Sequence, residues 1–247
     1  WTNFAFFIGA CKENLNKLSE LEKIKGCAGI KIFLGSSTGT LLVSDEKDIE
    51  LALKNCQRRV AIHSEDENRL KERFQNININ KGVIDHENWR DAESALISTK
   101  RVLFYSKKYK TKAHLLHIST FQEMELLKAK ENHITVEVTP QHLTFYSPDC
   151  YERLGSLTQM NPPIRSIEHQ KGLWKGINEG IVDVIGSDHA PHTLEEKKVR
   201  WPNSPSGMPG VQTMLSVMLN HVNNKKLSLN KLVQLMSENP CKIYNVK

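Results

Sequence analysis

The chain has 247 residues, enough to bury a sizeable hydrophobic core in one large domain or two small ones. Its 39% hydrophobic and 25% charged residues exclude a disordered chain, and no apolar run approaches the roughly 18 residues that a membrane span needs. The net charge of +6 comes from lysines spread along the chain, so nucleic-acid binding is not expected, and the densest cluster, 107–112, is predicted to be a solvated helix end.

Cysteine usage and the first residues bear on the cellular compartment. The five cysteines form no CxxC pair and are odd in number, which favours buried thiols in a reducing cytoplasm. The segment 1–9 has no basic leader, so it is predicted to be a strand and not a signal peptide.

Short β-rich runs alternate with segments of helical periodicity. The predicted strands are 4–8, 29–34, 59–63, 113–118, 134–139 and 182–187. The predicted helices are 13–24, 45–56, 65–75, 88–107, 121–129, 167–178, 211–222 and 229–237. This alternation predicts an α/β fold with a parallel sheet covered by helices, in a single domain over residues 1–247.

Six strands suit two architectures. A doubly wound sheet commonly carries a glycine-rich dinucleotide loop, but the nearest stretch, Gly35-Ser36-Ser37-Thr38-Gly39, has the wrong spacing. The other architecture is a (β/α)8 barrel from which two units are absent. The residues at the strand ends favour this barrel.

The strand predicted at 29–34 carries a lysine opposite its aliphatic residues. With a period of two, Ile30, Ile32 and Leu34 face the helices, whereas Lys31 and Phe33 face the barrel interior. Desolvation lowers the pKa of a lysine, and a neutral Lys31 amine could react with carbon dioxide to give a carbamate that bridges two metal ions. The alternative is a lysine paired with an acid or one that reaches the barrel rim.

Two further strands are predicted to bring histidines to the same region. Val60 and Ile62 face the helices, so His63 points inward at the end of its strand. His117 lies near the end of the next strand, while His114 is predicted to fall on the opposite face and to pack against the helices.

Polar groups also follow the fifth strand. Glu137 and His142 could orient a metal ligand from behind, or could form a turn-stabilising hydrogen bond. The loop 160–165 offers the amide of Asn161 and the guanidinium of Arg165 on a backbone fixed by two prolines. This loop could grip a carboxylate or an imide, or could simply lead into the next helix.

The last predicted strand ends in an acid. Asp188 follows it directly, with His189 and His192 in a proline-stiffened turn. An aspartate that caps the next turn is one interpretation. Barrel enzymes, however, place metal ligands and proton-transfer groups at the carboxyl ends of their strands.

Taken together, four inward-facing strands end in a possible metal ligand. These residues are Lys31, His63, His117 and Asp188. Imidazole, carboxylate and carbamate groups suit zinc or a similar divalent ion.

Several motifs occur in the order seen in dihydroorotases, which are metal-dependent TIM-barrel enzymes of the amidohydrolase superfamily. They are GIKIFLGSSTG, HSEDE, HLLHIST, EVTPQHL, MNPPIRS, SDHAPHTLEEK and the stretch 205–210. The sequence resembles these enzymes over essentially its whole length.

The resemblance implies metal-binding roles. Lys31 resembles the lysine that is carboxylated and bridges two zinc ions, and His63 and His117 resemble the ligands of the more exposed metal. Asp188 resembles the ligand of the buried metal that also acts as general base. Leu116 stands where some relatives carry the cysteine of a third metal site, so that site is not expected.

The resemblance also implies a substrate site. Asn161 and His192 resemble substrate-binding side chains, and backbone groups near Met208, Pro209 and Gly210 would face the substrate. The implied reaction is the reversible, zinc-dependent cyclisation of N-carbamoyl-L-aspartate to L-dihydroorotate, a step of cytoplasmic pyrimidine biosynthesis. The implied partners are this small-molecule substrate and either a second copy of the chain or a transcarbamoylase.

One departure from the family pattern bears on activity. The family's first strand carries a His-x-His pair for the buried metal, followed by a substrate-binding arginine, and this chain contains no such pair. The sequence begins where the family's third strand would be and stops before its terminal β-rich segment. We therefore expect a partial barrel that lacks the first two βα units and the C-terminal β segment.

Two other functions stay open. A sister cyclic amidase, of the allantoinase or dihydropyrimidinase type, would share the metal site, although Asn161 and His192 favour dihydroorotase. An inactive dihydroorotase-like scaffold would fit a chain that is complete without the His-x-His pair, although it would have no need of a buried Lys31.

Overall fold

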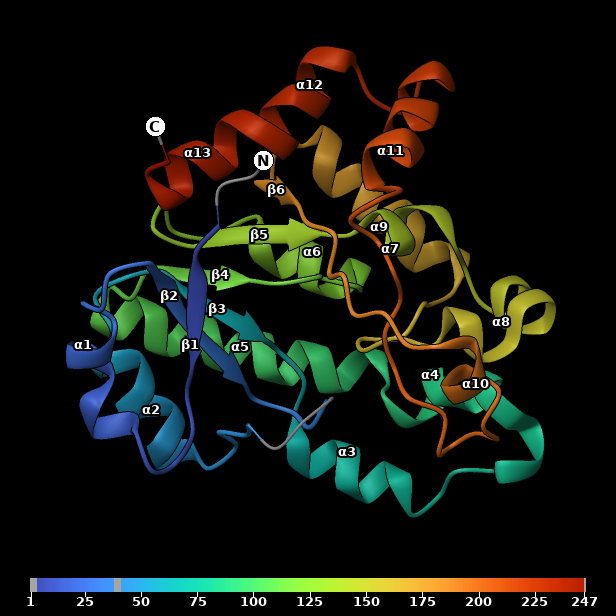
Figure 1. Ribbon diagram of the computed structural model, residues 1–247, viewed down its shortest axis with the longest axis horizontal. Coiled ribbons are helices and arrows are strands. Elements are labelled where there is room, and N and C mark those ends of the chain that lie inside the picture. Colours follow the sequence, from blue (N-terminus) through green and yellow to red (C-terminus); the bar gives the residue numbers. More distant parts are fainter. Residues whose placement is uncertain (1–3, 38–40, 247) are drawn as a thin grey trace.

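The computed structural model describes residues 4–37 and 41–246, which form a parallel sheet with helices packed against it (Figure 1). Its strands are β1 (Phe6–Gly9), β2 (Cys27–Phe33), β3 (Val60–His63), β4 (Ala113–Leu115), β5 (Thr135–Val138) and β6 (Val184–Ile185). All six predicted strands are therefore confirmed. Thr38 and Gly39 of the glycine-containing stretch lie outside the described residues.

The strands lie in sequence order, β1 to β6, and each neighbouring pair is parallel. A doubly wound sheet reverses its strand order at a switch point, so this order excludes that alternative. The strand direction turns progressively from β1 to β5 (Figure 1), as expected for a sheet with the usual twist. Among the described strands, β1 and β6 each pair on one side only, so the sheet has two open edges.

Helices connect the strands. The α-helices are α1 (Leu18–Leu21), α2 (Glu46–Asn55), α3 (Glu67–Phe74), α4 (His86–Trp89), α5 (Ala92–Tyr109), α6 (Phe121–Leu127), α7 (Pro140–Thr144), α8 (Asp149–Leu154), α9 (Ile167–Asn178), α10 (Leu194–Lys197), α11 (Met214–Asn223), α12 (Leu229–Val233) and α13 (Asn239–Tyr244). Segments of 3₁₀-helix are η1 (Leu15–Lys17), η2 (Ile79–Asp85) and η3 (Gly155–Thr158), and η4 (Gln234–Glu238) is a π-helical turn. Nowhere in the described chain is a helix both long and apolar enough to cross a membrane.

The helix predictions are right in place and partly wrong in extent. Helix α9 has the predicted bounds, but the predicted helix 88–107 is divided between α4 and α5. The division occurs because the Asp91 side chain accepts a hydrogen bond from the Ser94 N–H and starts a new helix. Helices α7, α8, α10 and α13 were not predicted, since four to six residues show too little periodicity.

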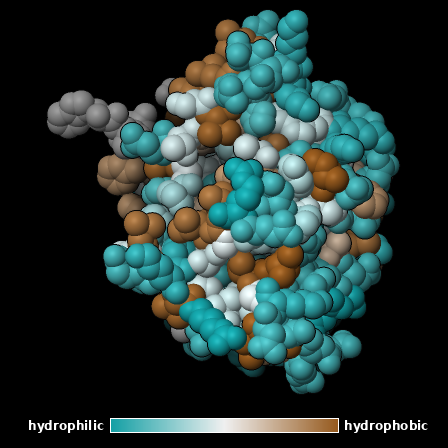
Figure 2. All heavy atoms as spheres, turned by 90° about the vertical axis from the view of Figure 1, so that its right-hand side faces the viewer, coloured by the Kyte–Doolittle hydropathy of each residue, from teal (hydrophilic) through white to brown (hydrophobic). Residues whose placement is uncertain are grey.

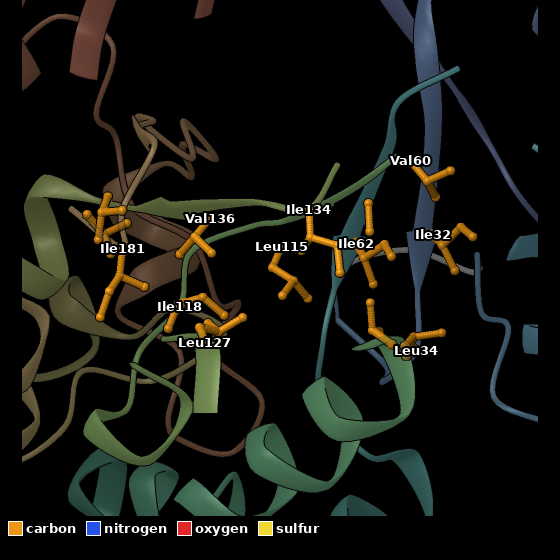
Figure 3. Close-up of a cluster of buried hydrophobic side chains, with 14 of the residues drawn as sticks. Ile32, Leu34, Val60, Ile62, Leu115, Ile118, Leu127, Ile134, Val136 and Ile181 are labelled. Carbon is orange, nitrogen blue, oxygen red and sulfur yellow. The ribbon is translucent and has the colours of Figure 1, made fainter. Parts of the chain in front are cut away.

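The outward face of the sheet forms the core against the helices. Ile30, Ile32 and Leu34 of the β2 segment are at most 1% exposed, as their spacing predicts. They belong to one buried cluster with side chains of β3, β4, β5 and helices such as α6 (Figure 3). The members labelled there are Ile32, Leu34, Val60, Ile62, Leu115, Ile118, Leu127, Ile134, Val136 and Ile181.

The opposite, inward face is polar, and it corrects the prediction for His114. The His114 ring contacts the Thr135 hydroxyl at 2.7 Å and the Glu137 carboxylate at 3.3 Å, so it lies on the inward face, where it also meets the Tyr244 ring of α13 edge-on at 6.0 Å. His117 also turns inward, because β4 ends at Leu115 and the backbone of His117 has a φ of 37°. Strict alternation therefore fails just beyond the strand end.

A close approach between β2 and β3 requires a glycine. A Cβ on Gly29 would lie 2.1 Å from the backbone carbonyl oxygen of Arg59, which accepts the Ile30 N–H. We expect Gly29→Ala to lower the free energy of unfolding by at least about 3 kcal/mol, because the two strands must separate. Gly26→Ala is the control: its φ is also positive but no atom lies within 4 Å of the added Cβ, so backbone strain of about 1 kcal/mol is expected. Urea denaturation measures both, and equal losses would contradict the close-approach argument.

Candidate active site

Five of the predicted site residues line one cavity of about 140 Å³ at the carboxyl ends of the strands. They are Lys31, His63, His117, Asn161 and Asp188. The face toward which the β4 and β5 arrows point in Figure 1 is mainly hydrophilic, with separate apolar patches (Figure 2). The structure thus brings together the four possible metal ligands and one of the proposed substrate residues.

The two histidines face each other. His63 Nδ1 lies 3.1 Å from His117 Nε2, and both rings are at most 3% exposed. Burial lowers the pKa of both imidazoles, so both are neutral near pH 7. Two nitrogens that share a tetrahedral zinc lie about 3.3 Å apart, given Zn–N bonds of about 2.0–2.1 Å, so the spacing suits a common metal ion.

A buried ion pair behind His63 sets its orientation, and sequence reasoning did not assign it. The Glu65 carboxylate lies 2.9 Å from His63 Nε2 and also accepts the guanidinium of Arg90, with both partners at most 1% exposed. Burial by itself raises the pKa of Glu65, but Arg90 and His63 outweigh it and hold that pKa well below its usual range. Since an ionised Glu65 accepts a hydrogen bond from the His63 Nε2–H, the Nδ1 lone pair of His63 is left free for a ligand.

Lys31 is half-buried in the lining of the cavity. Its Nζ is 4.3 Å from the centroid of the Phe33 ring. Burial lowers the pKa of Lys31, and the carboxylates of Asp188 and Glu137 oppose that shift without cancelling it. The predicted desolvated lysine is therefore supported, with acids near it, and a depressed pKa raises the fraction of reactive neutral amine.

Asp188 sits on strained backbone. It has a φ of 41°, as rarely adopted outside glycine as the φ of His117, and such strain concentrates at functional sites. The preceding Gly186 lets the chain pass Glu137, because a Cβ there would lie 2.3 Å from the Glu137 carboxylate. Burial raises the pKa of the Asp188 carboxyl, Lys31 opposes the shift and Glu137 adds to it.

The Asn161 side chain is held from both sides. Its Oδ1 accepts a hydrogen bond from His86 Nε2 at 2.9 Å, and its Nδ2 donates to the Ser37 hydroxyl at 3.3 Å. Arg165, by contrast, donates to the Ser119 hydroxyl and the Arg90 carbonyl and is 3% exposed. It is therefore a structural residue of this loop and does not face a ligand.

His142 also supports the loop. Its ring contacts the Thr139 hydroxyl at 2.8 Å and the Pro162 carbonyl at 3.1 Å, and burial lowers its pKa to about 4. Glu137 contacts His114 and not His142, so Glu137 and His142 do not form a pair. For His142, the turn-stabilising alternative is correct.

Hydrogen bonds to backbone carbonyls hold the segment that follows Asp188 against the site. The Lys197 ammonium donates to the carbonyls of Gln159 and Pro205, and the Gly207 N–H donates to the same Gln159 carbonyl. His192 is half-buried, 3.2 Å from the Ser206 carbonyl. Residue 206 and Gly207 line the cavity, so these hydrogen bonds fix one of its walls.

Three other predicted substrate residues line a neighbouring apolar cavity of about 270 Å³, whereas His192 lines neither cavity. The three are Met208, Pro209 and Gly210. His189, which sequence reasoning left without a role, accepts the Gly210 N–H at 3.0 Å and so anchors this stretch. The structure places both cavities beside the same loop but does not merge them.

A metal site is only partly assembled within the described residues. No group of three or more His, Cys, Asp or Glu side chains there is arranged to hold a metal ion. His63 and His117 supply two neutral nitrogens, and the buried His117 Nδ1 has no hydrogen-bond partner in the described chain. A carboxylated Lys31 would supply the third donor, so the residues present fit part of a zinc site.

Sequence comparisons point to one family. The chain is 35% identical to the dihydroorotase of Methanosarcina mazei over 96% of its own length, and 43% identical to that of Methanosphaera stadtmanae over 69%. This chain is a dihydroorotase homologue. It spans 54% and 39% of the lengths of these two dihydroorotases, and no family model matches it.

Solved structures agree on the fold of this dihydroorotase homologue. The L-hydantoinase (dihydropyrimidinase) of Arthrobacter aurescens superposes with a TM-score of 0.91 over 99% of the chain, at 25% identity, and the chain covers 56% of it. The dihydropyrimidinase of Brevibacillus agri superposes with a TM-score of 0.84 at 22% identity. These neighbours are amidohydrolase TIM barrels, so the six parallel strands form part of such a barrel, as predicted.

Proposed function

We propose that the protein containing this chain is a dihydroorotase, which interconverts N-carbamoyl-L-aspartate and L-dihydroorotate in pyrimidine biosynthesis in the cytoplasm. The observation that carries the proposal is the convergence of Lys31, His63, His117, Asn161 and Asp188 on one cavity. The identity to dihydroorotases along most of the chain supports the substrate.

The residues of this chain would have distinct roles in metal binding and proton transfer. Glu65 holds His63 in the tautomer that offers its Nδ1, and His63, His117 and a carboxylated Lys31 would hold zinc. Bound zinc polarises a carbonyl and lowers the pKa of a bound water. Asp188, with its raised pKa, would hold and release the proton that moves between water and the ring nitrogen.

The substrate would be oriented by neutral polar groups. The Asn161 amide is fixed by His86 and Ser37, so it can present its remaining hydrogen-bonding capacity without reorganisation. His192 precedes α10 and lies 3.2 Å from the Ser206 carbonyl, which comes shortly before 208–210, and these groups would contact the far end of the substrate.

A cyclic amidase with a hydantoin-like substrate is the second candidate, because the structural neighbours named above are hydantoinases and dihydropyrimidinases. The test is a substrate panel with protein expressed from the complete coding sequence and loaded with zinc. We expect turnover of dihydroorotate and carbamoyl-aspartate well above that of hydantoin, dihydrouracil and allantoin. A hydantoin preference would favour the second candidate, and filled metal sites without turnover of any of these substrates would favour an inactive scaffold.

The proposed partner is a second copy of the chain or a transcarbamoylase. Light scattering of the same preparation tests for the second copy, and co-purification from the native source tests for the transcarbamoylase.

A further inference from the structure

A second polar cavity lies at the opposite end of the sheet from the candidate active site. It has a volume of about 530 Å³, and its lining includes Gln57, Arg58, Arg59, Lys112, Lys242 and Asn245. Arg59 and Lys112 directly precede β3 and β4, so the cavity opens at the amino ends of these strands. Residues 242–245, at the carboxyl end of α13, form one side of the cavity.

The lining of this cavity is strongly cationic. Four of its residues are lysine or arginine, and none is aspartate or glutamate. In the described parts of the chain, the only ion pair from these four is Lys242 with Glu238, at 3.8 Å between exposed side chains. Glu22 lies nearby, but its carboxylate accepts the backbone N–H groups of residues 57 and 58. The four cations of the lining outnumber the nearby carboxylates of Glu22 and Asp183, so the cavity keeps an excess of positive charge.

Arg59 provides a separate observation. Its Nη1 donates to the His133 carbonyl and the Thr135 hydroxyl, both at 3.1 Å, which holds the guanidinium in place. Its Nε is buried and meets no acceptor among the described residues. Burial lowers the pKa of Arg59, and the Tyr244 and Asp183 side chains oppose that shift without cancelling it. Arg59 therefore contributes to the cavity lining a guanidinium that is fixed in place and has one hydrogen-bond donor that no described residue satisfies.

We propose that this cavity binds a small anion of the phosphate class, either free phosphate or the phosphate group of a metabolite. Arginine forks and lysine ammonium groups recognise phosphate oxygens, and a cavity of this volume admits a molecule up to nucleotide size. The site is separate from the proposed catalytic cavity, and it stands whether or not the proposed reaction is correct.

Inorganic phosphate is the probe for the test, titrated by calorimetry at constant ionic strength with chloride as the balancing ion. We expect saturable binding to the unmodified protein. The double variant Lys112→Gln/Lys242→Gln removes two exposed cations of the lining, and we expect it to raise the Kd for phosphate by at least about fivefold.

The matched control is Lys225→Gln/Lys226→Gln, which removes the same charge from another lysine-lined cavity that also contains Glu179. It should leave the Kd unchanged. Equal weakening by both double variants, or no saturable phosphate binding to the unmodified protein, would overturn the proposal. Tighter binding of a phosphate monoester such as a nucleoside monophosphate would identify a metabolite as the ligand, and equal affinity would identify free phosphate.

Discussion

Replacing Asp188 by asparagine is expected to lower kcat for dihydroorotate hydrolysis by at least about a thousandfold in the zinc-loaded protein expressed from the complete coding sequence. Asparagine keeps the size of the side chain but cannot accept and release the proton, and it is a weaker metal ligand. The burial that raises the pKa of Asp188, and the strained φ of 41°, both indicate a group placed for proton transfer.

The control for this prediction is Asp45→Asn, the same chemical change on a side chain that is 74% exposed and 4.0 Å from Lys12. It should leave kcat unchanged. Steady-state kinetics with zinc content measured in parallel separates loss of chemistry from loss of metal. An Asp188→Asn protein that retained more than a tenth of the activity would remove Asp188 from the proposed mechanism.

Replacing Glu65 by alanine is expected to lower the free energy of unfolding by about 3–5 kcal/mol. The variant leaves the Arg90 guanidinium buried without its counterion, and uncompensated buried charges are costly. It also frees His63 Nε2 from the acceptor that fixes its tautomer. Chemical denaturation at pH 7 measures the effect.

Two variants make this prediction specific. Asp149→Ala breaks the more exposed pair with Arg153 and should change stability little. The double variant Glu65→Leu/Arg90→Met removes both charges at once and should recover much of the loss, because apolar side chains of similar size can replace a buried pair. If Glu65→Ala cost no more than Asp149→Ala, the ion pair would have no structural role.

Much of the fold was predictable because strand signals are local. Six apolar runs with turn residues around them gave six strands, and the period of two placed Ile30, Ile32 and Leu34 on the helix side. The same rule put His63 and Lys31 inward, toward the candidate site.

The rule failed where the strand ended. His114 and His117 lie three residues apart, so alternation puts them on opposite faces, yet both turn inward because His117 has left-handed backbone. No pattern in the flanking residues gives that φ, since packing around the site sustains it.

The sequence by itself therefore determined where the strands lie along the chain and which residue types follow their carboxyl ends, because alternation and strand–helix spacing depend on neighbours in the chain. Only the tertiary structure decided which polar groups meet. The Glu65–Arg90 pair spans 25 residues, the Asn161 contact with Ser37 spans 124, and the cationic cavity joins the starts of two strands to the last helix. Such contacts depend on how the sheet curves and where loops return, which is a property of the whole packed chain.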